Sequence, residues 1–200
     1  MPDTGAPWNI PYVASTDLVS DWPADSLALA NAIDAGLDAA GGLVDVKSAL
    51  FTGTQSNSTA AGANFAVTDL SITHTLSDAS NKLIISAYLG AAATTEQYGN
   101  VGLAVADDGT LFGIGDAASN RTRVGAGGQV DDQGTTALVT MPSVTLVYEP
   151  GDTASHTYTV RAINMSASTQ TLYINRSQDD NDAATRPRAS SSFVIQEVKA

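Results

Sequence analysis

The spacing of hydrophobic and polar residues changes once along the chain, near residue 43. Before this point, the segment 21–42 repeats small and apolar residues at helical spacing. After it, apolar and polar side chains alternate with a period of two, which is typical of strands that bury one face. The pattern therefore predicts one helix followed by a mainly β domain that spans residues 43–200.

The segment 21–42 carries both start and stop signals of a helix. Ser20 or Asp21 can cap the N-terminus, Pro23 fits the first turn, and Gly41-Gly42 supplies a left-handed stop. Such a short helix is marginally stable alone, so we expect it to pack on copies of itself or on the β domain. Small and apolar residues recur as in a two-heptad coiled-coil seam, which predicts a trimerisation segment: Ser26, Ala30, Ile33, Leu37 and Ala40.

Strand-like runs separated by turn-forming residues fill the rest of the chain. Asp107-Asp108-Gly109 marks the clearest hairpin, because Asp-Gly accepts the positive φ angles of a tight turn. The connections leave no room for helical crossovers, so we expect an antiparallel β-sandwich of the jelly-roll type. The predicted strands lie near 43–52, 64–76, 82–90, 99–106, 110–115, 136–148, 155–165, 169–176 and 191–198.

Two stretches rich in small residues, 53–64 and 115–135, are predicted to be loops between strands. Loops lie on the surface and often carry binding residues. The second stretch is the longer one and contains Arg121 and Arg123, which makes these two residues the candidate surface contact.

Residues 1–20 form a segment punctuated by Pro2, Pro7 and Pro11, and we expect it to be extended. Its large apolar side chains have no partner of their own, and exposure to water costs roughly 25 cal/mol per Å². We therefore expect an arm that docks on a partner. The docking residues, continuing into the helix, are Trp8, Ile10, Tyr12, Leu18, Val19 and Trp22.

The charge of the chain argues against nucleic acid as a partner. The net charge is −12, so phosphate backbones would be repelled. Residues 1–46 hold seven aspartates and no lysine or arginine. An acidic arm of this kind suits a basic groove on a partner, and a solvated surface is the alternative interpretation.

The absence of cysteine, of a signal-peptide pattern and of a long apolar run favours a cytoplasmic site of assembly over export or membrane insertion. The sequence has no cysteine, which suits a reducing cytoplasm, and it has neither a signal-peptide pattern nor an apolar run of about 20 residues. We expect no membrane association. Without export, the Asn-x-Ser/Thr sites are expected to be ordinary loop and strand-end residues rather than glycosylated ones; they are Asn57, Asn120, Asn164 and Asn175.

The sequence offers little for catalysis, and we expect no catalytic residues, no cofactor and no bound metal. His74 and His156 each lie in a strand-like run beside threonine and are interpreted as ordinary strand residues. No nucleophile elbow, phosphate loop, dinucleotide fingerprint or His-Glu-x-x-His motif occurs. The acidic turn 179–182 could offer oxygen ligands to Ca²⁺, although its spacing departs from the calcium-loop pattern. The sequence does not decide that question.

The C-terminal residues resemble the closing strands of a recurrent phage knob domain. This family of tail-fibre, head-fibre and capsid-decoration proteins has a trimeric jelly roll similar to the tumour necrosis factor fold. The stretches 65–89 and 144–164 have the same character, so the resemblance covers about 150 residues. Its most specific part is Tyr173-Ile174-Asn175-Arg176-Ser177, then Asp179, Asp182, Ala183-Ala184-Thr185, Arg186 and Arg188, and finally 190–198.

The N-terminal residues Trp8-Asn9-Ile10-Pro11-Tyr12 and 16–23 resemble the virion-anchoring ends of phage fibre and minor tail proteins. The chain departs from the fibre pattern because no shaft separates helix and knob. The resemblance implies a non-enzymatic homotrimer on the virion surface, assembled in the host bacterial cytoplasm. It would be a capsid decoration or cement protein, or a short head-surface knob, bound to the major capsid protein or other virion proteins. The alternative is a tail-fibre or tail-tip protein that presents 53–64 and 115–135 to a host glycan or protein receptor.

Overall fold

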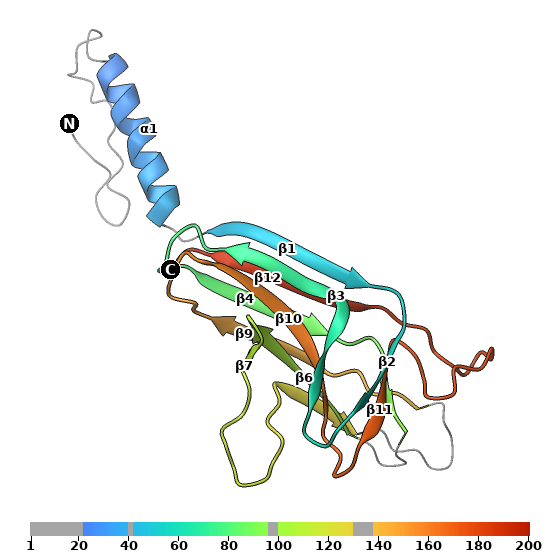
Figure 1. Ribbon diagram of the computed structural model, residues 1–200. Coiled ribbons are helices and arrows are strands. Elements are labelled where there is room, and N and C mark those ends of the chain that lie inside the picture. The colour runs from blue at the N-terminus through green and yellow to red at the C-terminus, as the bar shows by residue number, and fades with distance from the viewer. Residues whose placement is uncertain (1–21, 40–41, 96–99, 130–137) are drawn as a thin grey trace. The chain divides into compact units, whose positions relative to one another are not determined.

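Figure 1 shows the computed structural model of the protein, in which residues 22–39, 42–95, 100–129 and 138–200 are described. The chain divides into two compact units. One comprises Met1–Leu43 with Lys199–Ala200, and the other comprises Val44–Val198. The predicted arm at 1–20 lies outside the described residues.

The predicted helix is confirmed as α1, Trp22–Ala39. Alanine and leucine, which are strong helix formers, supply much of it. In the same unit, the backbone N–H of Lys199 donates to the carbonyl of Gly42 at 3.0 Å, so the segment that precedes β1 is hydrogen-bonded to the C-terminal end of the chain. No helix in the described ranges is both long and apolar enough to cross a membrane.

The predicted mainly β domain is confirmed, and most strands lie where the period-two pattern placed them. Three short strands were missed: β2 and β8 lie within the stretches predicted as loops, and β5 follows β4. The strands are β1 Leu43–Phe51, β2 Gln55–Thr59, β3 Asn64–Thr75, β4 Lys82–Tyr88, β5 Ala92–Thr94, β6 Asn100–Asp107, β7 Thr110–Phe112, β8 Ala126–Gln129, β9 Ser143–Tyr148, β10 Ser155–Asn164, β11 Gln170–Ile174 and β12 Ser191–Val198.

The missed strands lack the signal on which the prediction depended. β2 is Gln-Ser-Asn-Ser-Thr and β8 is Ala-Gly-Gly-Gln, so neither has large apolar side chains that alternate. Each pairs with an established strand instead, β2 with β11 and β8 with β6. Tertiary pairing therefore overrides weak strand propensity here.

Three antiparallel sheets build the β unit. The first has the order β1-β12-β4-β9, and the second has the order β3-β10-β6-β7, with β8 also paired to β6. A third, short sheet has the order β2-β11-β5 (Figure 1). Both larger sheets place strands from the two halves of the chain side by side. The predicted antiparallel β-sandwich is confirmed, and its finer classification as a jelly roll stays a prediction.

The core lies between the two larger sheets. Phe193 and Ile195 of β12 and Leu83 and Ile85 of β4 point inward from the first sheet, and all are buried. They belong to one cluster with inward residues of the second sheet, namely Val67, Leu70, Ile72, Val101, Leu103, Val105, Tyr158, Val160 and Ala162. Burial of this shared apolar surface holds the sheets together.

The predicted hairpin at Asp107-Asp108-Gly109 is confirmed. Asp107 pairs with Thr110 across the turn, so only Asp108 and Gly109 form the loop. Their φ angles are 45° and 89°, as a two-residue type I′ turn requires. The turn fixes the Asp107 and Asp108 carboxylates at the end of β6.

Candidate functional site

The first sheet has an outer face on which half of the side chains are apolar. Val147 on β9 is 62% exposed and Leu50 on β1 is 61% exposed, although both are aliphatic. The outer face, as used below, consists of the outward residues of the four strands: Val44, Val46, Ser48 and Leu50; Ser192, Val194, Gln196 and Val198; Lys82, Ile84, Ser86 and Tyr88; and Ser143, Thr145, Val147 and Glu149.

Strand register places these side chains in rows across the sheet. Ile84 lies between Gln196 on one side and Val147 on the other. Hydroxyl groups in the next row satisfy each other, since Ser86 Oγ lies 3.0 Å from Thr145 Oγ1. If a partner covered this face, the Ser86 and Thr145 hydroxyls would therefore still have a hydrogen-bond partner.

Charge on the outer face is confined to one ion pair at its end. Lys82 Nζ lies 2.8 Å from Glu149 Oε1, and the two charges cancel. Several large apolar side chains are exposed on this one face, among them Val46, Leu50 and Val147, and such a grouping on a monomer is a mark of an interaction site. The outer face is therefore the strongest candidate for a contact surface.

Of the predicted helix seam, Ala30 and Ile33 are exposed on α1, and Ile33 is 45% exposed. Leu27, which lies off the seam, is also exposed. The side chain of Leu37 and the whole of Ala40 lie outside what the structure describes. Ser26, the first seam residue, is exposed as well, so the described seam residues are all accessible, and trimerisation through the seam stays a prediction.

The predicted docking residues fall in the undescribed N-terminal segment, except for the last. Trp22 is the first residue of α1, and its side chain is not described. Docking through Trp8, Ile10 and Tyr12, and through Leu18 and Val19, stays a prediction.

Arg121 and Arg123, the predicted surface contact, are both exposed. Arg121 lines a hollow of about 530 Å³ together with Asn120, Thr122 and residues of 61–62 and 165–167. Arg123 lines an adjoining hollow of about 400 Å³, and its Nε donates to the carbonyl of Gly115 at 2.6 Å. The structure therefore places the two arginines beside neighbouring hollows, and their role as a contact surface stays a prediction.

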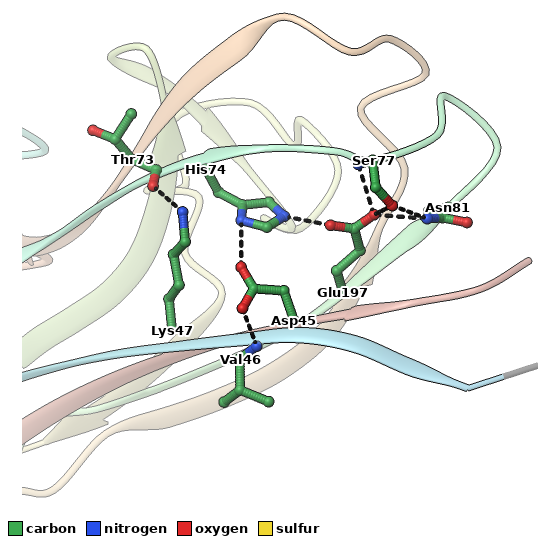
Figure 2. A network of polar contacts seen from close by, with 8 residues as sticks. All are labelled: Asp45, Val46, Lys47, Thr73, His74, Ser77, Asn81 and Glu197. Carbon is green, nitrogen blue, oxygen red and sulfur yellow. Dashed lines mark hydrogen bonds and ion pairs between the residues drawn. The ribbon is translucent and has the colours of Figure 1, made fainter.

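His74 belongs to a buried network rather than to an exposed site (Figure 2). Glu197, which is 1% exposed, accepts hydrogen bonds from Ser77 N–H at 2.9 Å and from the Ser77 hydroxyl and Asn81 Nδ2 at 2.6 Å each. Its other oxygen lies 2.9 Å from His74 Nε2, while His74 Nδ1 faces Asp45 Oδ2 at 3.6 Å. The network connects β3, β12 and β1.

The electrostatics of this network favour a charged Glu197. Burial raises the pKa of Glu197, but the hydrogen bonds from Ser77, Asn81 and His74 outweigh it and lower the pKa below its usual value. Because both His74 and Glu197 are buried, the pair is placed to hold the sheets together rather than to meet a substrate. Sequence analysis interpreted His74 as an ordinary strand residue and missed this pairing.

The acidic turn is neutralised by arginine. Arg186 Nε donates to Asp179 Oδ1 at 2.6 Å, and Arg188 contacts Asp180 at 2.8 Å. Arg176 lies 3.4 Å from Asp180. Carboxylates held by guanidinium groups in this way are poorly placed to ligate Ca²⁺ as well.

Two of the four Asn-x-Ser/Thr sites are fully buried. The Asn164 side chain donates to the carbonyls of Thr59 and Ser168, both at 2.8 Å. Asn175 is equally buried. Neither amide is accessible for glycosylation in the folded protein.

No protein-family model matches the chain, and no curated protein sequence matches it.

Proposed function

We propose that the protein is a non-enzymatic bacteriophage virion protein that works as a homotrimer and decorates or cements the capsid through its N-terminal arm. The observation that carries this proposal is the outer face, defined above, on the β1-β12-β4-β9 sheet. We infer three copies rather than another number because the C-terminal residues resemble phage knob domains, which are trimeric.

Charge explains why this face is the one suited to self-association. Each chain has a net charge of −12, so copies repel one another through most of their surface. The outer face carries the Lys82–Glu149 pair, whose charges cancel, and its remaining members are uncharged. Association through this face gains apolar burial at little Coulombic cost.

A trimer would also concentrate the docking arms. Three arms on one particle-bound trimer bind with an effective concentration set by their tethers, so avidity exceeds the affinity of one arm. A cement protein stabilises the assembled shell by binding it in preference to dissociated subunits, by RT ln(1 + [L]/Kd), which is about 2.7 kcal/mol per site at 100 times Kd.

A second candidate function, receptor binding at a tail tip, is favoured by the hollow at Arg121. A cavity of about 530 Å³ with an arginine and an asparagine in its wall could accept a host glycan or a peptide carboxylate. The same fold serves both functions, so the experiment must separate them.

The test compares phage particles that carry the protein with particles depleted of it. Cement function predicts that depleted particles lose infectivity sooner on heating or osmotic shock, that added trimer restores survival, and that host adsorption is unchanged. An Arg121→Ala variant should restore survival as well as the natural protein does. Lost adsorption with unchanged survival would reject cement function and support receptor binding.

A further inference from the structure

Three potential metal ligands converge beside the β6–β7 turn. His156 Nδ1 lies 2.8 Å from Asp107 Oδ1 and 3.5 Å from Asp108 Oδ2. All three atoms lie within 4.8 Å of one another. The carboxylates come from the end of β6 and its turn, and the imidazole comes from β10, which pairs with β6. Neighbouring strands therefore fix the arrangement.

The remaining polar atom of each ligand is held by a different neighbour. The Tyr148 hydroxyl donates to Asp107 Oδ2 at 2.8 Å, and the backbone N–H of Thr157 donates to Asp108 Oδ1 at 3.0 Å. His156 Nε2 lies 3.0 Å from Asp152 Oδ1. His156 Nδ1 also lies at hydrogen-bond distance from Asp107 Oδ1, so a metal ion would replace the proton on Nδ1 while Nε2–H donates to Asp152.

Carboxylates outnumber positive groups at this cluster. Asp107, Asp108 and Asp152 direct three negative charges at one imidazole, which carries at most one positive charge. In the part of the chain that the structure describes, each recorded ion pair of these carboxylates goes to His156. A divalent ion among them would remove this excess.

We propose that Asp107 Oδ1, Asp108 Oδ2 and His156 Nδ1 bind a divalent zinc-like metal ion, with Asp152 orienting the imidazole. Imidazole and carboxylate together suit Zn²⁺, whereas Ca²⁺ and Mg²⁺ prefer oxygen ligands throughout. Zinc-binding histidines usually direct their other ring nitrogen at a carboxylate, a carbonyl or water, and Asp152 supplies such a carboxylate here. Asp108 is 58% exposed at its side chain, so a fourth position is open to water or to a group from a partner.

The ion would act as a cross-link. It would tie the β6–β7 turn to β10 and, through Asp152, to the segment that precedes β10. This role is independent of the proposed virion function, because it concerns the stability of the single β unit. Metal binding requires an imidazole nitrogen without a proton, so affinity should fall as the pH is lowered.

The test titrates Zn²⁺ into chelator-treated full-length protein by calorimetry and follows the His156 ring nitrogens by ¹⁵N NMR. We expect one ion per chain, a large shift of Nδ1 and little change at Nε2, and a higher melting temperature. Asp107→Asn and His156→Asn should each weaken binding at least about 100-fold. Asp152→Asn should weaken it about 10- to 100-fold, because it removes only the orienting carboxylate.

Asp116→Asn is the matched control, since Asp116 is an exposed acid elsewhere on the surface. It should bind Zn²⁺ like the natural protein, and circular dichroism should show that every variant is folded. Equal affinity of the His156→Asn variant and the natural protein would overturn the proposal. So would the absence of saturable Zn²⁺ binding by the natural protein, which would leave the cluster as an ion-pair network alone.

Discussion

His74 on β3 and Glu197 on β12 face each other across the interior, with Nε2 of His74 2.9 Å from Oε2 of Glu197. Each occupies the inward position that follows an apolar one, Ile72 before His74 and Ile195 before Glu197. The buried pair (Figure 2) therefore joins the two larger sheets beside the apolar core.

Breaking this pair should be costly. Replacing one member leaves the other buried without its partner, which costs about 3–5 kcal/mol of unfolding free energy. We expect Glu197→Leu and His74→Leu each to fall in this range by urea denaturation followed by circular dichroism. The double variant should be more stable than the sum of the two losses predicts, because two apolar residues can pack together. Strictly additive losses would show that the pair is not coupled.

The lowered pKa of Glu197 predicts that the folded protein loses stability in acid. Its pKa is lowered in the folded protein, whereas the unfolded chain titrates near the ordinary value of 4.5. Its contribution to stability is therefore complete above about pH 4.5 and is lost as the pH falls through the lower folded pKa. The urea midpoint of the natural protein should drop across this range, and that of Glu197→Gln should drop less. Parallel curves for the two proteins would exclude Glu197 as a cause.

The sequence was sufficient to predict the large strands and the helix, but not the polar pairs. Alternating apolar residues located β3, β4 and β12, because burial of one sheet face imposes that pattern. The pairing of His74 with Glu197 joins residues 123 positions apart, and no local period records it. The same reason hid the cluster at His156, because its neighbours Asp107 and Asp108 lie at the end of β6 and in the turn that follows, about 50 residues earlier in the chain.

The resemblance to phage knob domains pointed to residues whose structural role was not visible in the sequence. Asn175 adopts a φ angle of 63°, and its side chain donates to the carbonyls of Phe51 at 2.8 Å and Gly53 at 2.9 Å. The Ser191 hydroxyl donates to its Oδ1 at 2.6 Å. One asparagine thus joins the end of β1 to the start of β12.

Asn175→Ala should therefore destabilise the β unit strongly. It removes three side-chain hydrogen bonds from a buried site and places a Cβ-bearing residue without local hydrogen bonding in a left-handed conformation. We expect a loss of about 3 kcal/mol or more in urea denaturation. Asn175→Gly keeps the backbone freedom and should be about 1 kcal/mol less harmful. A loss under about 1 kcal/mol for both variants would contradict this role.

A charge placed on the outer face should prevent self-association without unfolding the chain. Val147 is 62% exposed, so Val147→Glu should leave the urea midpoint of the β unit nearly unchanged. In an assembled trimer, the new carboxylates would be buried or set against like charges. We expect association at least about 100-fold weaker by sedimentation equilibrium.

Ser71→Glu, on an exposed position of β3, is the matched control and should remain trimeric. A trimeric Val147→Glu variant would exclude this face as the interface.

The arm should be the anchor to the virion. Deleting residues 1–20 should leave the β unit folded, because that unit comprises Val44–Val198, and should abolish attachment to depleted particles. Trp8→Ala with Tyr12→Ala should weaken attachment more than Asp3→Asn with Asp17→Asn if apolar burial dominates. The measurement is the number of copies bound per particle, at increasing salt.

Salt separates the two contributions of the arm. The Debye length falls from about 10 Å at 0.1 M to about 3 Å at 1 M, so the part of the binding that comes from the aspartates should be screened. The part that comes from Trp8 and Tyr12 should persist at high salt, because apolar burial is not weakened by screening. The natural protein should therefore keep most of its attachment at 1 M salt, whereas the double alanine variant should detach. Stoichiometric attachment of the truncated protein would show that the anchor lies elsewhere in the chain.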